Sequence, residues 1–425
     1  LIKYEPDCAS LSLQYELLSR TTNKNDDNLF DDDNKDSINY LNGKKYIIID
    51  AGGGTVDIGC HQFMDNYSAK ELFYPTGGPW GDMYIEKAFI NILHELIGND
   101  ILDTIKNESG NGYFDLLQNF RKVRNEFQDQ NDGTNVNIEL PPDFMDAITR
   151  QIGIDKFEEM VTQFKYKGHK NCFSYFEGYL GIDCLIWKQY LFDPLIKPVI
   201  QHINTLLSKN IMKNCKYIYL VGGYSQTPYF KYKMRSAFGL KSKHKIDIII
   251  PKTPILCVVD GAARMGLLRN DKRRYIQCRI LSKTYGQLLA IDYKQLNLND
   301  YTQDYIDKNT KTYKDGSKWL NGCFKIFARK GDAMAYDSTC IIKSRRWDKN
   351  TKRQNIIICT SDIENPKTIQ DEAQKLCKLT LLWNENDESV GAVTKITFQE
   401  TLKVVTYKES DPSEALHTTI EYESK

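Results

Sequence analysis

The sequence predicts an α/β fold that is followed by a β-rich C-terminal part, and two patterns carry this prediction. Between residues 193 and 268, helix-like and strand-like segments alternate, which is the order expected of a sheet covered by helices. These segments are 193–207, 216–221, 227–238, 246–250 and 254–268. Beyond about residue 275 the pattern changes to short alternating strands with polar turns, for example 379–383, 393–398, 402–407 and 418–422. A chain of 425 residues is long enough for two or three such units.

The first well-marked elements surround a run of glycines. Residues 45–50 (KYIIID) are apolar and β-branched, AGGG follows, and residues 55–61 (TVDIGCH) alternate. This order predicts a strand, a glycine turn and a second strand. After GGPWG at 77–81, apolar residues recur with helical spacing from Ile85 to Ile97, and Gly98 ends the pattern.

The remaining segments have weaker patterns. Residues 21–37 are rich in Asn and Asp and predict a solvated acidic loop. Residues from about 100 to 190 mix helical patterns (114–127 and 154–164) with a strand-like stretch at 135–140, which indicates an inserted subdomain. A basic cluster between residues 343 and 353 is expected at a solvated hairpin tip.

Composition excludes several classes of protein. Lys+Arg number 57 and Asp+Glu 56, so a net charge of +1 does not indicate a dedicated nucleic-acid surface. The apolar runs fall far short of the ~20 residues that a membrane span needs. The eleven cysteines include no CxxC pair, which favours reduced thiols in a cytosolic or nuclear protein over a disulfide framework or a zinc site.

The stretch Asp50 to Asp57 (DAGGGTVD) is the most informative one for chemistry. Consecutive glycines between two strands let backbone N–H groups approach an anion without a Cβ in the way, so a phosphate fits there. Asp50, at the end of a buried strand, would point at that phosphate, which is favourable only with Mg²⁺ and its waters between them. Thr55 adds a hydroxyl donor. A hairpin that merely needs glycines would explain one or two of the three.

Other candidates are weaker by themselves. Gly222 and Gly223 follow a strand and precede a helix, where backbone can run close to a ligand. His61 is expected to be a packed residue because no HxxxH or HExxH motif pairs it with a metal. Asp50 and Asp57 could be a carboxylate pair for glycoside chemistry, but their spacing across a glycine turn fits a phosphate cradle better.

Five motifs together resemble the C-terminal part of the actin-like (ribonuclease H-like) ATPase domain of the seventy-kilodalton heat-shock chaperones. They occur in the family's order: EPDCAS from residue 5, DAGGGTVD from 50, GGPWGD from 77, LVGGYSQTP from 220 and DGAARMGLL from 260. The residues of these motifs are most similar to those of the divergent 12A/12B branch of that family. The resemblance covers essentially the whole chain, tightly at the motifs and loosely elsewhere.

The resemblance implies a site that binds ATP and Mg²⁺. Asp50 would hold a water on the metal, and Glu5 would lie beside it, near the γ-phosphate and the attacking water. The residues implied to bind nucleotide are Gly52, Gly53, Gly54, Thr55, Asp57, Gly77, Gly78, Arg121, Arg124, Gly222, Gly223 and Gln226. Gln226 stands where the family has an adenine-stacking Arg, and Arg121 and Arg124 stand where it has a Glu and a Lys that contact the ribose. An Arg cannot accept hydroxyl protons as a Glu does.

The resemblance also implies a domain plan. Residues 1–44 would be a remnant of the first ATPase lobe with the acidic loop, 45–272 the second lobe with its insertion at about 100–190, and 275–425 a β-rich module similar to a substrate-binding part. The family's first phosphate hairpin (Asp-x-Gly-Thr-Thr) and the Lys that follows it do not occur in these residues. The chain is therefore either a fragment of a longer ATPase, which we favour, or a truncated paralogue that cannot complete a phosphate clamp. In both cases we expect these residues to be inactive by themselves.

The leading functional hypothesis is a chaperone-like protein whose full-length parent binds Mg·ATP and hydrolyses it slowly. Its partners would be ATP and ADP, unfolded or extended peptides and co-chaperones, with no nucleic acid and no membrane span. An alternative is an actin-like interaction scaffold that does not hydrolyse nucleotide. A sugar kinase of the same superfamily is a more remote alternative, because GGPWGD and LVGGYSQTP follow the chaperone pattern.

Overall fold

The structure is a computed structural model that describes residues 5–22, 41–64, 68–267, 276–313, 316–346, 351–384, 387, 391–399 and 401–420. The predicted acidic loop falls outside these residues except for its first two positions, and so does the end of the predicted strand 418–422. The chain divides into two compact units. The α/β unit comprises Tyr4–Phe63 and Pro75–Arg269, and the β unit comprises Leu1–Lys3, Met64–Tyr74 and Asn270–Lys425. The domain limits predicted from the sequence stay a prediction.

The glycine-rich segments of the α/β unit are positioned by a sheet that includes four of its strands. They are β1 (Lys45–Ala51), β2 (Val56–Met64), β7 (Cys215–Val221) and β8 (Asp247–Ile249), side by side in the order β2-β1-β7-β8. The β2 strand is antiparallel to β1, and β7 is parallel to it. Central strand β1 is fully buried from Tyr46 to Ile49, as its continuous apolar run predicts.

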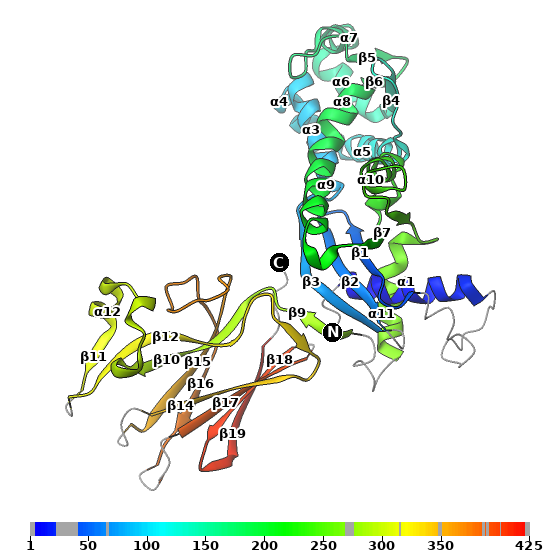
Figure 1. Cartoon of the computed structure of the whole chain (residues 1–425). Coiled ribbons are helices and arrows are strands. Elements are labelled where there is room, and N and C mark those ends of the chain that lie inside the picture. Colours follow the sequence, from blue (N-terminus) through cyan, green and yellow to red (C-terminus); the bar gives the residue numbers. More distant parts are fainter. Residues whose placement is uncertain are drawn as a thin grey trace. The chain divides into compact units, whose positions relative to one another are not determined.

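Two helices that lie at the two ends of the unit's sequence pack side by side against this sheet (Figure 1). They are α1 (Glu5–Thr22), which the sequence patterns did not predict, and α11 (Cys257–Leu267), which follows the 3-10 turn η5 (Pro254–Leu256). Ala9 and Leu13 of α1 and Cys257 of α11 share one buried cluster with Tyr46 and Tyr219 of the sheet. The sheet therefore holds the start of α1 close to the end of β1.

The other helices of the unit confirm most of the predicted segments. The predicted helices are α3 (Met83–Ile97), α9 (Asp193–Leu207) and α10 (Pro228–Phe238). The 3-10 turns η3 (Asn210–Met212) and η4 (Tyr224–Gln226) flank β7. Between α8 (Cys184–Ile186) and α9 runs a π-helix, η2 (Trp187–Phe192), that periodicity did not reveal.

The inserted subdomain is a small mixed structure grouped around one end of α9, away from strands β1 and β2 (Figure 1). Its helices are α4 (Asn99–Glu108), α5 (Gly110–Glu126), α6 (Pro142–Ile152) and α7 (Ile154–Gln163). Strands β4 (Asn135–Glu139), β5 (Phe173–Phe176) and β6 (Tyr179–Asp183) pair in the order β4-β6-β5. Stacked rings of Phe89, Phe120 and Trp187 join α3, α5 and η2, with centroids 4.1 and 5.3 Å apart.

The β unit consists almost entirely of strands, as predicted. A five-stranded sheet has the order β11-β12-β10-β15-β16, and a four-stranded sheet has the order β14-β17-β18-β19. Strand β9 pairs with the first part of β3 and with β13. The elements are β3 (Ser68–Gly78), β9 (Ile276–Ile280), β10 (Thr284–Asp292), η7 (Tyr293–Gln295), η8 (Leu298–Asp300), α12 (Gln303–Asn309), β11 (Thr310–Thr312), β12 (Lys318–Ala328), β13 (Ala333–Ala335), β14 (Thr339–Arg345), β15 (Arg353–Ser361), β16 (Gln374–Leu382), β17 (Gly391–Phe398), β18 (Leu402–Lys408) and β19 (Asp411–Ile420).

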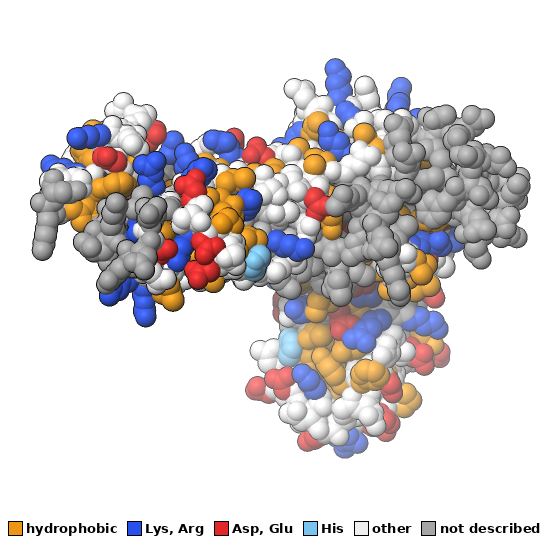
Figure 2. Space-filling view, turned by 90° about the horizontal axis from the view of Figure 1, so that it is seen from below, with side chains coloured by type: hydrophobic (Ala, Val, Ile, Leu, Met, Phe, Trp, Pro, Cys, Tyr) orange, Lys and Arg blue, Asp and Glu red, His pale blue; other side chains and the backbone are white. Residues whose placement is uncertain are grey.

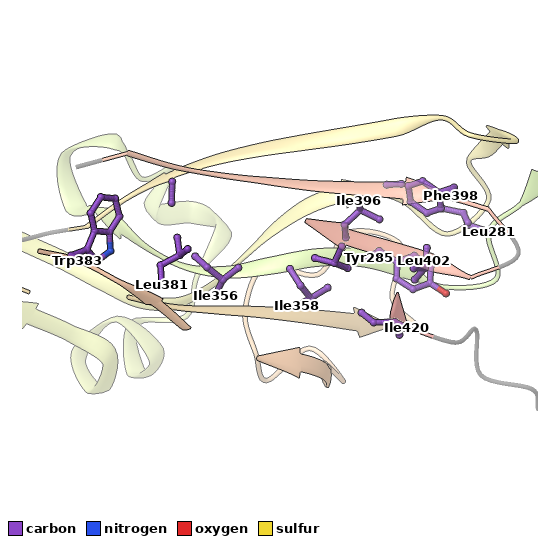
Figure 3. Close-up of a cluster of buried hydrophobic side chains, with 13 residues drawn as sticks. Leu281, Tyr285, Ile356, Ile358, Leu381, Trp383, Ile396, Phe398, Leu402 and Ile420 are labelled. Atoms are coloured by element: carbon purple, nitrogen blue, oxygen red, sulfur yellow. The ribbon is translucent and has the colours of Figure 1, made fainter. Parts of the chain in front are cut away.

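The core of the β unit joins its two larger sheets. Figure 3 shows Ile356, Ile358 and Leu381 from one sheet facing Ile396 and Leu402 from the other. These side chains are buried and apolar, so this core is a packed interior of the sandwich type. It gives the unit a hydrophobic core of its own.

A buried lysine at the edge of this core provides a test of the packing. The Lys408 side chain is 4% exposed, and its Nζ lies 3.0 Å from Asp387 Oδ2 and 3.2 Å from Glu414 Oε2. It also lies over the Trp383 ring, 5.7 Å from the centroid, and the Arg346 guanidinium lies 4.5 Å from the same ring. Arg346, predicted at a solvated hairpin tip, is instead 5% exposed because it stacks on this tryptophan.

We expect Lys408→Met to lower the free energy of unfolding of the β unit by about 2 kcal/mol, because it leaves Asp387 without its ammonium partner. Denaturant titration measures the loss. Lys403→Met, on the same strand but exposed, is the matched control and should change stability by less than about 0.5 kcal/mol. Equal losses in the two variants would contradict the role given to the buried pair.

The surface carries charges of both signs. On the face seen in Figure 2, Lys and Arg side chains are interspersed with Asp and Glu side chains, in keeping with the net charge of +1. Among the helices that the structure describes, none is long and apolar enough to cross a membrane.

Candidate functional site

The glycine hairpin between β1 and β2 is held through its carbonyl oxygens. Three successive carbonyls accept from the segment that leads into α3: Gly52 from the Asp82 N–H, Gly53 from Met83 and Gly54 from Gly81 (3.3, 3.0 and 3.3 Å). Within the described residues, the N–H groups of Gly53, Gly54 and Thr55 make no backbone hydrogen bond. Neighbouring unpaired N–H groups of this kind form an anion-binding surface.

The glycines of the GGPWG segment support this hairpin from behind. A Cβ on Gly81 would lie 2.2 Å from the Gly53 carbonyl oxygen, and a Cβ on Gly77 would lie 2.2 Å from that of Val56. A Cβ on Gly78 would lie 2.6 Å from the Trp80 ring. At Gly77 and Gly81 the neighbouring backbone therefore approaches too closely for any other residue. Gly77, predicted to bind nucleotide, lies against Val56 and Asp57 of β2, and its role in nucleotide binding stays a prediction.

Three carboxyl groups gather where β1 ends. Asp50 is 7% exposed and lies directly opposite Asp57 in the β1–β2 register. Glu5, the exposed first residue of α1, is near enough to affect its titration. Burial, followed by the negative charges of Glu5 and Asp57, raises the pKa of Asp50 to about 7. The Thr55 hydroxyl donates to Asp57 Oδ2 at 2.7 Å.

This donor set fits a hard divalent cation. Mg²⁺ prefers carboxylate oxygens and keeps several of its waters. A buried carboxylate beside two others is unfavourable unless a cation offsets its charge. Asp50, with Glu5 and Asp57 around it, would hold such an ion.

The raised pKa of Asp50 leads to a pH prediction. Below about pH 7 a proton occupies this carboxyl and competes with a cation. Binding of Mg·ADP should therefore strengthen as pH rises from 6 to 8, by up to about tenfold per pH unit below 7. In the absence of ligand, the free energy of unfolding changes with pH in the opposite direction. The folded state binds the Asp50 proton more tightly than the unfolded state does, so the stability due to this proton is lost as pH rises from about 4 to 7.

Titration calorimetry at several pH values tests this prediction. Asp50→Asn is the control, because it retains the ionisation of the nucleotide phosphates and removes that of the side chain. A wild-type pH profile that coincides with that of Asp50→Asn would contradict the prediction.

The second glycine pair meets the first motif directly. Val221, the last residue of β7, pairs with Asp50, so Gly222 comes next to that carboxyl. Gly222 has φ +84, and a Cβ there would lie 2.4 Å from the Ala51 carbonyl oxygen and 2.5 Å from Asp50 Oδ1. Its N–H donates to the Pro254 carbonyl at 3.0 Å. Gly223 and Gln226 lie beyond it and are exposed, as a ligand surface requires.

The two arginines are already paired within the protein. Arg121 donates from Nε and Nη2 to the two carboxylate oxygens of Glu86, at 2.5 and 2.9 Å. Arg124 Nη2 lies 2.8 Å from Asp82 Oδ2. Sequence reasoning missed Asp82 and Glu86. The available signal was their position, since both lie in the first residues around the start of α3, directly after the GGPWG turn.

The EPDCAS segment forms the start of α1 and is fixed by polar contacts. The Ser10 hydroxyl and the Tyr46 hydroxyl are 2.5 Å apart, and the Ser12 hydroxyl donates to Asp260 of α11 at 2.7 Å. His61 Nε2 lies 3.3 Å from Asp7 Oδ1. His61 is 2% exposed, so the prediction that it is a packed residue is confirmed. These contacts fix the end of the helix that carries Glu5.

Comparison of the sequence with those of known proteins finds similar proteins in the heat shock 70 kDa group. Over 352 residues the chain is 26% identical to human heat shock 70 kDa protein 12A and 27% identical to the mouse protein, which covers 79% of this chain and 46% of each relative. Human heat shock 70 kDa protein 12B is 25% identical over 294 residues, 69% of this chain and 40% of that protein. This chain is similar to heat shock 70 kDa proteins 12A and 12B.

The predicted resemblance to the 12A/12B branch of the heat-shock family is therefore confirmed, and so is the mixed α/β part followed by a β-rich part. No family model matches the chain. The chain spans about half the length of the heat shock 70 kDa relatives it matches, 46% for the 12A proteins.

Proposed function

We propose that the α/β unit is the nucleotide-binding part of an actin-like ATPase of the seventy-kilodalton heat-shock type. The observation that carries this proposal is the position of Asp50. It is buried at the end of β1, has a raised pKa, and lies against Gly222 beside the unpaired N–H groups of the hairpin. Two motifs far apart in the sequence thus converge on one carboxyl group, which a purely structural hairpin does not require.

The roles of the residues follow from this geometry. The N–H groups of Gly53, Gly54 and Thr55 would bind phosphate oxygens, and the Asp50 carboxylate would hold Mg²⁺. The ion supplies charge stabilisation on the phosphates when it is bound. Glu5, exposed at the start of α1, orients the attacking water. Hydrolysis is then slow and depends on positioning and charge, since phosphoryl transfer needs little covalent chemistry from the protein.

The nucleoside part of the site is weaker. The exposed backbone of Gly223 and the side chain of Gln226 offer a surface for the adenosine, without the stacking guanidinium of ordinary relatives. Arg121 already donates two hydrogen bonds to the Glu86 carboxylate, so this edge of its guanidinium is not open to a ribose. We infer that phosphates contribute more of the affinity than adenosine does.

The second candidate is a scaffold that does not hydrolyse nucleotide. The observation that favours it is the internal pairing of both arginines, which takes two cations away from the ligand. Calorimetry with Mg·ATP and single-turnover measurement of phosphate release, both on the full-length protein, separate the two functions. Binding without release would favour the scaffold, and ATP turnover that depends on an added sugar would favour a kinase.

For the β unit we propose binding of extended peptides in the cytosol or nucleus, with co-chaperones as further partners. An extended peptide can add to the edge of an existing sheet. Strands β16 and β19 each lie at an edge of their sheets and offer such positions. A peptide array with no binding above background would contradict this part and leave the β unit as a support of the α/β unit.

A further inference from the structure

A buried arginine connects α5 of the inserted subdomain to the glycine hairpin. Arg124 is 8% exposed. Its Nη2 lies 2.8 Å from Asp82 Oδ2, and its Nη1 donates to the Asp82 carbonyl oxygen at 3.2 Å. Its Nε and Nη2 also reach Asn125 Oδ1 at 3.2 and 3.0 Å. The guanidinium is therefore occupied by protein groups on both of its edges.

Asp82 connects this guanidinium to the hairpin. Its N–H donates to the Gly52 carbonyl at 3.3 Å, as one of the three bonds that hold the hairpin glycines. Its Oδ1 would lie 3.7 Å from a Cβ on Gly53, so the carboxylate also faces the loop. An anchored Asp82 thus fixes the direction of the unpaired N–H groups of the hairpin.

The charge of Asp82 makes the arginine necessary. The Asp82 side chain is only 17% exposed and lies beside the place where phosphate would bind. An uncompensated carboxylate there would repel a phosphate, and burial would favour its protonated form. Arg124 cancels that charge and prevents the carboxylate from turning toward the ligand.

The same pair reaches the second glycine motif. Tyr224, which follows Gly222 and Gly223, is 1% exposed. Burial, followed by the charge of Asp82, raises its pKa, and Arg124 lowers it, so both charges lie close to this ring. The charges of Asp82 and Arg124 therefore lie near the segment after β7 as well as near the hairpin.

We propose that Arg124 is a positioning residue of the phosphate site, which acts through Asp82 and does not contact the nucleoside. This inference rests on the proposed nucleotide function. It replaces the ribose contact that the resemblance implies for Arg124 with an electrostatic and structural role, and it makes α5 a direct support of the hairpin.

The first test measures hydrogen exchange of the whole chain without nucleotide. Arg124→Met should speed exchange of the Gly81, Asp82 and Met83 amides by about tenfold, because the bonds to the hairpin carbonyls open more often. The double variant Asp82→Asn/Arg124→Met removes both charges and should recover most of the protection. Lys122→Met, exposed on the same helix, is the control and should leave exchange unchanged. Unchanged exchange in Arg124→Met would overturn the proposal.

The second test compares ligands by ligand-observed NMR titration, which measures weak binding. Arg124→Met should weaken Mg·ADP by about tenfold and adenosine by less than about twofold, and the double variant should restore most of the Mg·ADP affinity. A merely structural loss would weaken both ligands equally, and that result would overturn the proposal. If Arg124→Met does not fold, Arg124→Lys, which keeps the charge but loses the fork, replaces it in both tests.

The two proposals fail in different ways. If the unsubstituted chain binds neither Mg·ADP nor adenosine, the nucleotide function is contradicted. The exchange comparison then decides by itself whether Arg124 holds the hairpin.

Discussion

Replacing Asp50 with Asn in the full-length protein should lower the rate of ATP hydrolysis by about 10²–10³-fold, while Mg·ATP affinity falls much less. The reason is the position of this carboxyl. It is buried at the end of β1, lies opposite Asp57 and near the charge of Glu5, and lies against Gly222. Loss of its charge would remove the carboxylate that would hold the cation, while the N–H groups that would bind the phosphates remain.

Single-turnover measurement of phosphate release checks this result, with calorimetry for affinity. Asp247→Asn is the matched control, because Asp247 is an exposed carboxylate on β8 of the same sheet and should leave hydrolysis unchanged. Asp50→Ala should behave like Asp50→Asn with a somewhat lower stability. Turnover that is the same in Asp50→Asn and wild type would show that the assignment is wrong.

The largest effect on stability is expected for Gly261→Ala. A Cβ at this position of α11 would lie 1.7 Å from the Cys8 carbonyl oxygen and 2.5 Å from its carbonyl carbon. These are backbone atoms of α1, so no side chain can move aside and the two helices must separate. The separation would also weaken the Ser12–Asp260 hydrogen bond of 2.7 Å. We expect a loss of about 3 kcal/mol or more in the free energy of unfolding.

A second glycine in the same helix is the control. Among the residues that the structure describes, none would lie within 4 Å of a Cβ on Gly266, so Gly266→Ala should stabilise the helix by about 0.5–1 kcal/mol. Denaturant unfolding of both variants gives effects of opposite sign. A destabilisation of less than about 0.5 kcal/mol by Gly261→Ala would mean that α1 and α11 do not pack as closely as described.

Sequence patterns predicted those parts of the fold whose residues are apolar at regular spacing. The α3 and α9 helices and the central strands β1 and β7 follow this rule, because both burial and periodicity are strong there. The α1 helix was missed because its buried face includes Asp7, Ser10 and Gln14, whose polar partners include His61 and the Tyr46 hydroxyl. A polar buried face gives no hydrophobic period.

The candidate site was predictable to a similar extent. Glycine runs reveal close backbone approach, so Gly52 to Gly54, Gly77 and Gly222 could be selected from the sequence. The pairs Arg121–Glu86 and Arg124–Asp82 could not, because they join α5 to α3 and to the residue before α3, and the register between these segments depends on tertiary packing. Tertiary packing also explains Arg346. Its basic neighbours in the sequence predicted an exposed side chain, but its guanidinium packs on the Trp383 ring.

The π-helix Trp187–Phe192 affects how sequences of this kind should be aligned. A π-turn holds one residue more than an α-turn, so every position after it is rotated by about 100° around the helix axis relative to an uninterrupted α-helix. Trp187 and Phe192 pack on the aromatic cluster before α9, and Ile196, Val199 and Ile203 are buried within α9. A relative that lacks one residue here could keep both buried faces only by closing the wide turn. An alignment gap of one residue within 187–192 is therefore compatible with an unchanged core, whereas the same gap inside α9 would rotate its buried face toward solvent.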